Sequence, residues 1–111
     1  MPPKDELAKR RYDKLVDRVE TLVRASLKPE YRGYGGRLVL NAEDIEELGG
    51  SPDEIRRAAR AVGRRLGWKT LTREIDGRIF ILDDREPPQP VRDLMARRAT
   101  DALDAFLGRD D

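Results

Sequence analysis

Apolar residues recur at spacings of three and four over two stretches of the chain, one near each end. The first stretch covers residues 5 to 27, and the second covers residues 91 to 107, after prolines at 87, 88 and 90. Because charged residues fill the intervening positions, both stretches are predicted to form long amphipathic helices. The apolar positions are Ala8, Tyr12, Leu15, Val16, Val19, Leu22 and Val23 in the first helix, and Val91, Leu94, Met95, Ala99, Ala102, Leu103 and Phe106 in the second.

The segment between these helices begins with a loop, a strand and a short helix. Residues 31 to 36 contain too much glycine for a regular element and predict a mobile loop. The mostly apolar residues 37 to 40, bounded by glycine and asparagine, predict a brief strand. Asn41 can cap a helix over residues 42 to 48, which Gly49-Gly50 would end.

A third helix and a β-hairpin come next along the chain. Ser51 as N-cap and Pro52 at the first helical position begin a helix over residues 52 to 66. Asp76-Gly77 suits a two-residue type I′ turn in a hairpin over residues 69 to 82. In the register that such a turn sets, both faces of the second strand are apolar, so one face can close the core while the other needs cover from a terminal helix or a partner. The first set is Leu71, Ile75, Phe80 and Leu82, and the second is Ile79 and Ile81.

Composition narrows the possible classes of protein. A chain of 111 residues fits a single domain over residues 1 to 111, and 38% hydrophobic against 41% charged residues predicts a thin core. The chain has neither cysteine nor histidine, which excludes disulfides, thiolate nucleophiles, Ser-His dyads and ordinary zinc sites. We therefore expect no enzyme, cofactor or metal site. No apolar run is long enough to cross a bilayer or to form a signal peptide, so we expect a cytoplasmic protein.

The order helix, strand, short helix, helix and hairpin resembles that of winged helix-turn-helix DNA-binding proteins of the bacterial regulator type. The resemblance implies an α+β fold, with an α-β-α-α-β-β core flanked by long terminal helices. Residues 37 to 86 would form the helix-turn-helix and its wing, with the helix over residues 52 to 66 as recognition helix and the hairpin over residues 69 to 82 as wing.

The helix over residues 52 to 66 has an apolar side and an arginine side. At about 100° per residue, the apolar positions 55, 58, 59, 62 and 66 lie opposite the arginines. From residue 55 to residue 73 the chain carries seven basic residues and no acidic ones. Guanidinium groups on a helix in the major groove can bond phosphates or guanine edges. The candidate DNA-binding residues are Arg56, Arg57 and Arg60 for base contacts, Arg64, Lys69 and Arg73 for phosphates, and Arg78 beside the wing tip for the backbone or the minor groove.

The acidic residues leave a second interpretation open. Residues 41 to 54 carry six acidic residues and no basic ones, so the arginines could form a solvated face that is neutralised within the chain. The net charge of the whole chain is only +1. Any attraction for nucleic acid would therefore be local.

The leading hypothesis is a homodimeric transcriptional regulator, cytoplasmic and associated with the nucleoid. It would place two copies of the helix over residues 52 to 66 in successive major grooves of double-stranded DNA. Terminal helices commonly pair the subunits of such regulators, so residues 5 to 27 and 91 to 107 resemble a dimerisation layer. The alternative is a winged-helix protein-protein interaction module whose basic face docks an acidic partner without sequence-specific DNA binding.

Overall fold

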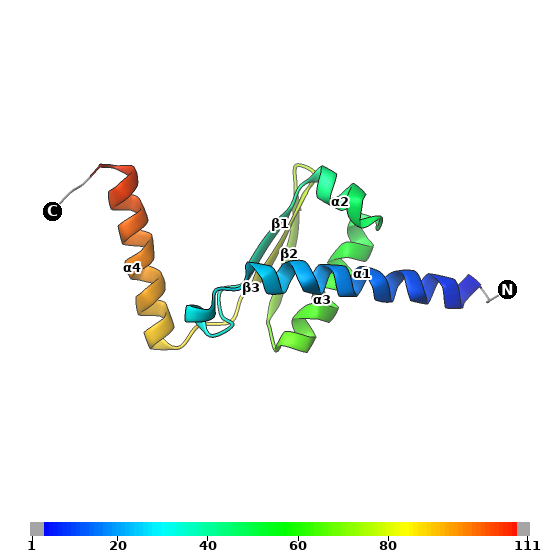
Figure 1. Ribbon diagram of the computed structural model, residues 1–111, viewed down its shortest axis with the longest axis horizontal. Coiled ribbons are helices and arrows are strands. Elements are labelled where there is room, and N and C mark those ends of the chain that lie inside the picture. The colour runs from blue at the N-terminus through cyan, green and yellow to red at the C-terminus, as the bar shows by residue number, and fades with distance from the viewer. Residues whose placement is uncertain (1–3, 109–111) are drawn as a thin grey trace.

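The computed structural model describes residues 4 to 108, so residues 1 to 3 and 109 to 111 at the two ends of the chain lie outside it. The fold is α+β, with one three-stranded antiparallel sheet in the order β1-β3-β2 (Figure 1). Every helix and strand expected from the sequence is present, with ends within two residues of the predicted ones. The elements are α1 (Lys4–Ser26), a 3-10 turn η1 (Pro29–Tyr31), β1 (Arg37–Leu40), α2 (Ala42–Leu48), α3 (Pro52–Leu66), β2 (Thr70–Ile75), β3 (Arg78–Asp83) and α4 (Gln89–Phe106).

Local chemistry accounts for where the middle elements begin. The side chains of Asn41 and Ser51 each accept a hydrogen bond from the backbone N–H three residues on, and both belong to complete capping boxes. Between β2 and β3, Asp76 and Gly77 have φ angles of 52° and 75°. Two successive positive φ angles define the type I′ turn, whose twist matches that of the flanking strands.

The register of the sheet separates two faces. Residues directly opposite each other in an antiparallel pair point to the same side. Ile79 and Ile81 of the central strand lie on the inner face and are 0% exposed. The outer face carries the other apolar set of the hairpin, as the two-residue turn predicts. The outer-face residues of the three strands are Arg37, Val39, Leu71, Arg73, Ile75, Arg78, Phe80 and Leu82.

α1 and α3 pack against each other and against the inner face of the sheet (Figure 1). The apolar side of α3 is buried, as predicted from its periodicity. Gly63 lets α3 approach β2, because a Cβ at this position would overlap the side chain of Thr70. The hairpin is thereby held close beside α3. The core cluster is Leu15, Val16, Val19, Val23, Leu40, Ile55, Ala58, Ala59, Val62, Ile79 and Ile81.

α4 stands apart from this core (Figure 1). Its first turns pack on η1, where Tyr31 is 9% exposed and where Arg98 forms an ion pair of 2.7 Å with Glu30. The sequence predicted only an irregular loop from residue 31, whereas Tyr31 belongs to the 3-10 turn. The glycines at residues 33 to 36 predicted the loop, but they carry no information about the burial of Tyr31, which makes the apolar contact with α4.

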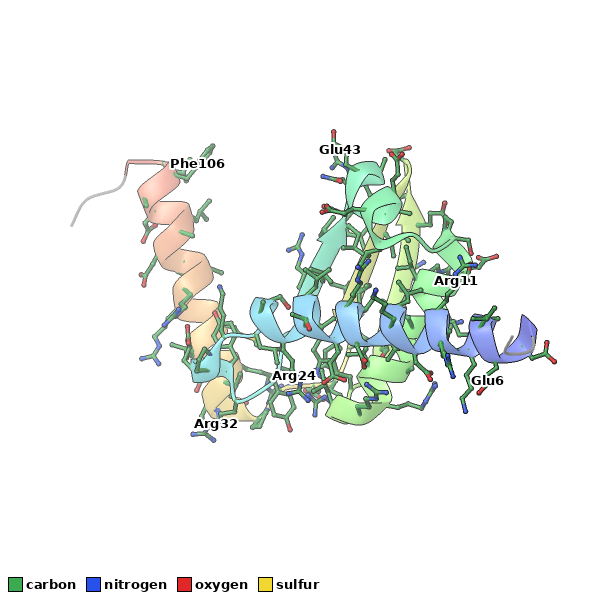
Figure 2. The ribbon with its side chains drawn as sticks, turned by 45° about the vertical axis from the view of Figure 1, so that its right-hand side comes forward. Glu6, Arg11, Arg24, Arg32, Glu43 and Phe106 are labelled. Carbon is green, nitrogen blue, oxygen red and sulfur yellow. The ribbon has the colours of Figure 1, made fainter. Side chains whose placement is uncertain are left out.

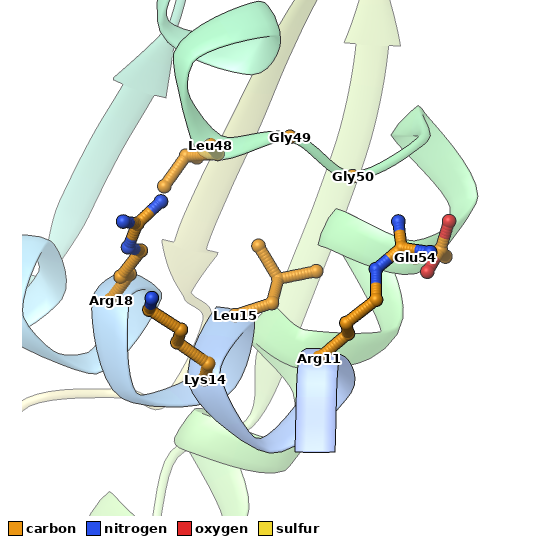
Figure 3. A pocket seen from close by; sticks show the side chains of 8 residues that line it. All are labelled: Arg11, Lys14, Leu15, Arg18, Leu48, Gly49, Gly50 and Glu54. Atoms are coloured by element: carbon orange, nitrogen blue, oxygen red, sulfur yellow. The ribbon is translucent and has the colours of Figure 1, made fainter. Parts of the chain in front are cut away.

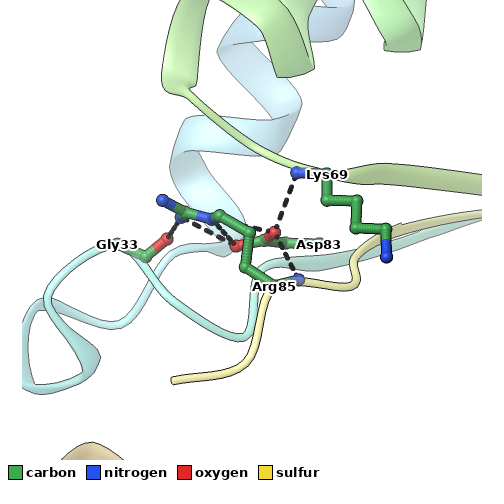
Figure 4. Close-up of polar contacts among 4 residues, drawn as sticks. All are labelled: Gly33, Lys69, Asp83 and Arg85. Carbon is green, nitrogen blue, oxygen red and sulfur yellow. Dashed lines mark hydrogen bonds and ion pairs between the residues drawn. The ribbon is translucent and has the colours of Figure 1, made fainter. Parts of the chain in front are cut away.

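A buried ion pair determines how the chain leaves β3 toward α4 (Figure 4). The Asp83 side chain is 0% exposed and accepts bonds of 2.8 to 3.0 Å from the Arg85 guanidinium. The same guanidinium donates to the carbonyl of Gly33 at 2.9 Å and lies over the ring of Tyr34. The Asp83 carboxylate raises the pKa of Arg85. These contacts tie the linker to the loop before β1.

Replacing Arg85 by alanine is expected to lower the free energy of unfolding by about 1 to 3 kcal/mol, because it leaves the buried Asp83 carboxylate without its guanidinium partner. Urea denaturation followed by circular dichroism measures the loss. Arg92→Ala is the matched control, since its ion pair with Glu86 lies in the same region but is exposed, at 44% and 77%. Equal losses in the two variants would contradict the structural role of Arg85.

Candidate nucleic-acid interface

The outward side of α3 presents a short row of arginines. Arg57, Arg60 and Arg64 are exposed and lie three and four residues apart, on one side of the helix. The side chains of Arg60 and Arg64 make no hydrogen bond or ion pair within residues 4 to 108. Their guanidinium groups can therefore bind an external acceptor without first breaking a contact of the fold.

Three of the five arginines of α3, including Arg57 of the row, are engaged inside the chain. Arg56 donates from Nε to the Thr72 hydroxyl of β2 at 3.1 Å, which fixes it between α3 and the hairpin. Arg57 lies over the ring of Tyr12 in α1, at 4.1 Å from the centroid. Arg65 turns to α1, where its ion pairs reach Glu20 at 2.7 Å and Asp17 at 3.7 Å. The periodicity of α3 does not reveal these partners.

Two carboxylates beside this row are held in the charged form. Hydrogen bonds from Arg65, and next from Arg24, lower the pKa of Glu20. Glu54 at the start of α3 accepts from the backbone N–H of Ser51, and this bond is the main cause of its lowered pKa. Glu20 is thus neutralised by Arg65 and Arg24, whereas Glu54 keeps its negative charge near Arg11 and Arg57.

The remaining predicted contact residues lie at the hairpin. Lys69 is exposed between α3 and β2. Arg73 and Arg78 are exposed too, but their register places them on the outer face of the sheet, opposite the side that packs on α3. Arg78 directly follows the turn, so it lies at the wing tip. The structure thus brings Arg56, Arg57, Arg60 and Arg64 together and separates Arg73 from them.

A cationic cavity lies beside the α2–α3 turn (Figure 3). It has a volume of about 190 Å³, and Arg11, Lys14 and Arg18 of α1 extend toward the turn at Gly49-Gly50. Leu15, Leu48 and Glu54 complete its lining. These three cations were missed by the sequence interpretation of the site, although their spacing at i, i+3 and i+7 places them on one side of a helix.

Three of the four acidic residues of α2 face solvent. Glu43, Glu46 and Glu47 are exposed, and Figure 2 shows Glu43 at the outer end of α2. Asp44 is partly buried, and its carboxylate accepts the backbone N–H of Asn41 at 2.9 Å. α2 therefore contributes exposed negative charge directly before α3 in the chain, as its composition predicted.

Within residues 4 to 108, no group of His, Cys, Asp or Glu side chains is placed to hold a metal ion. None of the helices in that range has the length and apolar character needed to span a membrane. Comparison of the chain with protein-family models, with curated proteins and with solved structures gave no match.

Proposed function

We propose that this chain is a winged helix-turn-helix protein that binds double-stranded DNA by inserting α3 into the major groove. The observation that carries the proposal is the pair Arg60 and Arg64, whose side chains are exposed and have no partner among residues 4 to 108, on the helix that precedes the hairpin. An α-helix fits the width of the major groove, and arginine forks match phosphates and guanine edges. The protein would act as a homodimeric transcriptional regulator, by occupying its site.

The internal contacts of Arg56 and Arg57 suit a supporting part in this interface. Stacking on Tyr12 holds the Arg57 side chain along α1, and the bond to Thr72 holds Arg56 against the hairpin. Side chains that are already ordered lose less conformational entropy when they bind. Arg78 at the wing tip would reach the backbone or the minor groove, and Lys69 would remain a phosphate contact.

The cationic cavity supplies phosphate contacts that α2 cannot. In helix-turn-helix complexes the elements beside the recognition helix position the protein on the phosphate backbone. Here α2 is acidic, whereas Arg11, Lys14 and Arg18 concentrate positive charge at the turn that leads into α3. We assign these three cations of α1 to a backbone phosphate at the edge of the groove.

The test is the salt dependence of binding to random-sequence duplex DNA, measured by fluorescence anisotropy. A phosphate interface releases counterions, so the logarithm of the binding constant should fall linearly with the logarithm of salt concentration. A slope of about −0.9 for each neutralised phosphate is expected. Absence of binding at low salt would contradict the proposal.

Replacing Lys14 and Arg18 by alanine together is expected to make that slope shallower by about 1 to 2, because one or two phosphate contacts are lost. Lys9→Ala is the control, since Lys9 is exposed on the same helix but does not line the cavity. An unchanged slope in the double variant would mean that these residues of α1 do not contact DNA phosphates. It would not contradict the contact proposed for α3.

The exposed acids of α2 favour a second candidate, a protein-protein interaction module. A mixed acidic and basic surface suits a partner of complementary charge pattern. Under this alternative the same salt titration would show no duplex binding, so one experiment separates the two functions.

A further inference from the structure

α4 carries one apolar stripe, of which only the first half is covered. Val91 is buried, and Leu94 and Met95 are partly buried where the helix packs on η1. After Met95 every residue of α4 except Asp104 is exposed, with Leu103 at 51% and Phe106 at 86%. Figures 1 and 2 show α4 standing apart from the sheet, and Figure 2 shows Phe106 at its far end.

The outer face of the sheet has an uncovered apolar surface as well. Val39 is 37% exposed and Ile75 is 49% exposed, and Leu71, Phe80 and Leu82 are only partly buried. Three arginines and no acidic residue accompany them on the outer face of the strands. α1 and α3 lie on the opposite face, so no helix of the core covers this surface.

We propose that two copies of this chain pair by exchange, with the C-terminal half of α4 of each copy seated on the outer sheet face of the other. The proposal rests on the homodimer of the proposed function and names its interface. The uncovered half of α4 begins with Arg97 and Arg98, but beyond them residues 99 to 107 contain two acidic residues and no basic residue, so the far end of α4 complements the arginines of the sheet face. Their apolar side chains would cover each other in the same contact.

The dimensions of the two surfaces also match. The exposed half of α4, from residue 96 to residue 106, extends about 16 Å at 1.5 Å per residue. Neighbouring strands lie about 4.8 Å apart, so the three strands of the sheet span about 10 Å from the first to the third. The uncovered part of the helix is therefore long enough to cross the three strands of a partner, and two equal contacts of this kind close a twofold dimer.

The contacts of Arg85 with Asp83 and Gly33 oppose another arrangement, in which α4 folds back on the sheet of its own chain. Asp83 and Gly33 hold Arg85 at the root of the linker, and Pro87-Pro88 stiffens the segment that leads into α4. The ion pair between Glu30 and Arg98, midway along α4, also ties the helix to η1. While these contacts persist, the apolar end of α4 stays apart from the sheet of its own chain (Figure 1). In the pair, Arg37 and Arg73 face the partner helix and Arg78 at the wing tip stays available to DNA.

Cross-linking tests the exchange directly, because the chain contains no cysteine of its own. Val39→Cys and Ala102→Cys are prepared as separate proteins, mixed, allowed to re-equilibrate, and treated with a short thiol-reactive cross-linker. The expected product joins residue 39 of one copy to residue 102 of the other, as identified by peptide mass. Glu43→Cys replaces Val39→Cys as a control for random collision, and it should give little product.

Three results would overturn the exchange. A dominant 102–102 product would mean that α4 pairs with α4. An intramolecular product in the dilute Val39→Cys, Ala102→Cys double variant would mean that α4 folds back on its own sheet. A yield no higher than that of the Glu43→Cys control would mean that the two surfaces do not meet.

Phe106→Glu provides a second readout that does not depend on cross-linking. Because Phe106 is 86% exposed, its replacement leaves the fold of one copy intact, and the circular dichroism spectrum should not change. The dissociation constant of the dimer, from analytical ultracentrifugation, should rise about tenfold or more. Leu7→Glu is the matched control on the other terminal helix, where Leu7 is 45% exposed, and it should leave dimerisation unchanged.

A fall in dimerisation with Leu7→Glu and not with Phe106→Glu would assign the interface to α1 and refute the proposal. Neither measurement contains DNA, so a failure of DNA binding and a failure of the exchange are seen separately.

Discussion

Ile79→Ala is expected to lower the free energy of unfolding by about 2 to 5 kcal/mol, the range found for removing a large buried aliphatic side chain. Ile79 is 0% exposed in the central strand, where it lies opposite Leu40 and contributes to a core of few residues. The protein has little other apolar material to fill the cavity, so relaxation would recover little of the loss. Urea denaturation followed by circular dichroism gives the value.

The matched control is Ile75→Ala, which changes the same residue type in the same hairpin. Ile75 is 49% exposed on the outer face, so its loss should stay within about 1 kcal/mol. Both variants are made together with Phe106→Glu, so that a covered outer face in a dimer does not contribute. Equal losses from the two positions would mean that the two faces of the hairpin are equally buried, against the register of the sheet.

Replacing Arg60 and Arg64 by alanine together is expected to weaken binding to duplex DNA about 30-fold or more, since each guanidinium contact contributes roughly 1 to 3 kcal/mol. These two side chains have no partner in the described fold, so the melting temperature should not fall with the affinity. Anisotropy titration at constant salt measures the affinity, and a thermal melt verifies the fold.

The control for net charge is the double variant Arg24→Ala, Arg32→Ala, which removes the same charge from positions outside α3 (Figure 2). Because the net charge of the protein is only +1, its overall electrostatic attraction for DNA is small. The effect of each cation on the affinity should therefore depend on its position. If the control variant weakened binding as much as the α3 variant, the contact would be unspecific and α3 would not be the recognition helix.

The order and bounds of the elements could be predicted from the sequence because local signals determine them. Apolar periodicity located α1, α3 and α4, and the capping residues Asn41 and Ser51 determined where α2 and α3 begin. Asp76-Gly77 set both the turn and the register of the hairpin, which separated Ile79 and Ile81 from the outer-face residues. Each signal depends on neighbours within a few positions, so no knowledge of the tertiary fold was needed.

The availability of each arginine was decided only by tertiary packing. Arg56, Arg57 and Arg65 look equivalent to Arg60 and Arg64 along the sequence, yet Thr72, Tyr12 and Glu20 hold them. These partners come from elements far away in the chain, and a helical pattern carries no information about them.

The position of α4 likewise depended on contacts that no periodicity describes. Its apolar stripe predicted an apolar partner surface. The buried Tyr31 and the ion pair of Arg85 with Asp83 determined that only the first half of the helix contacts such a surface within the chain. An apolar stripe shows that a helix face favours burial. It does not show against which surface, because the hydrophobic effect is not directional. Which surface covers it depends on where distant segments meet, and this is decided by the folded chain as a whole.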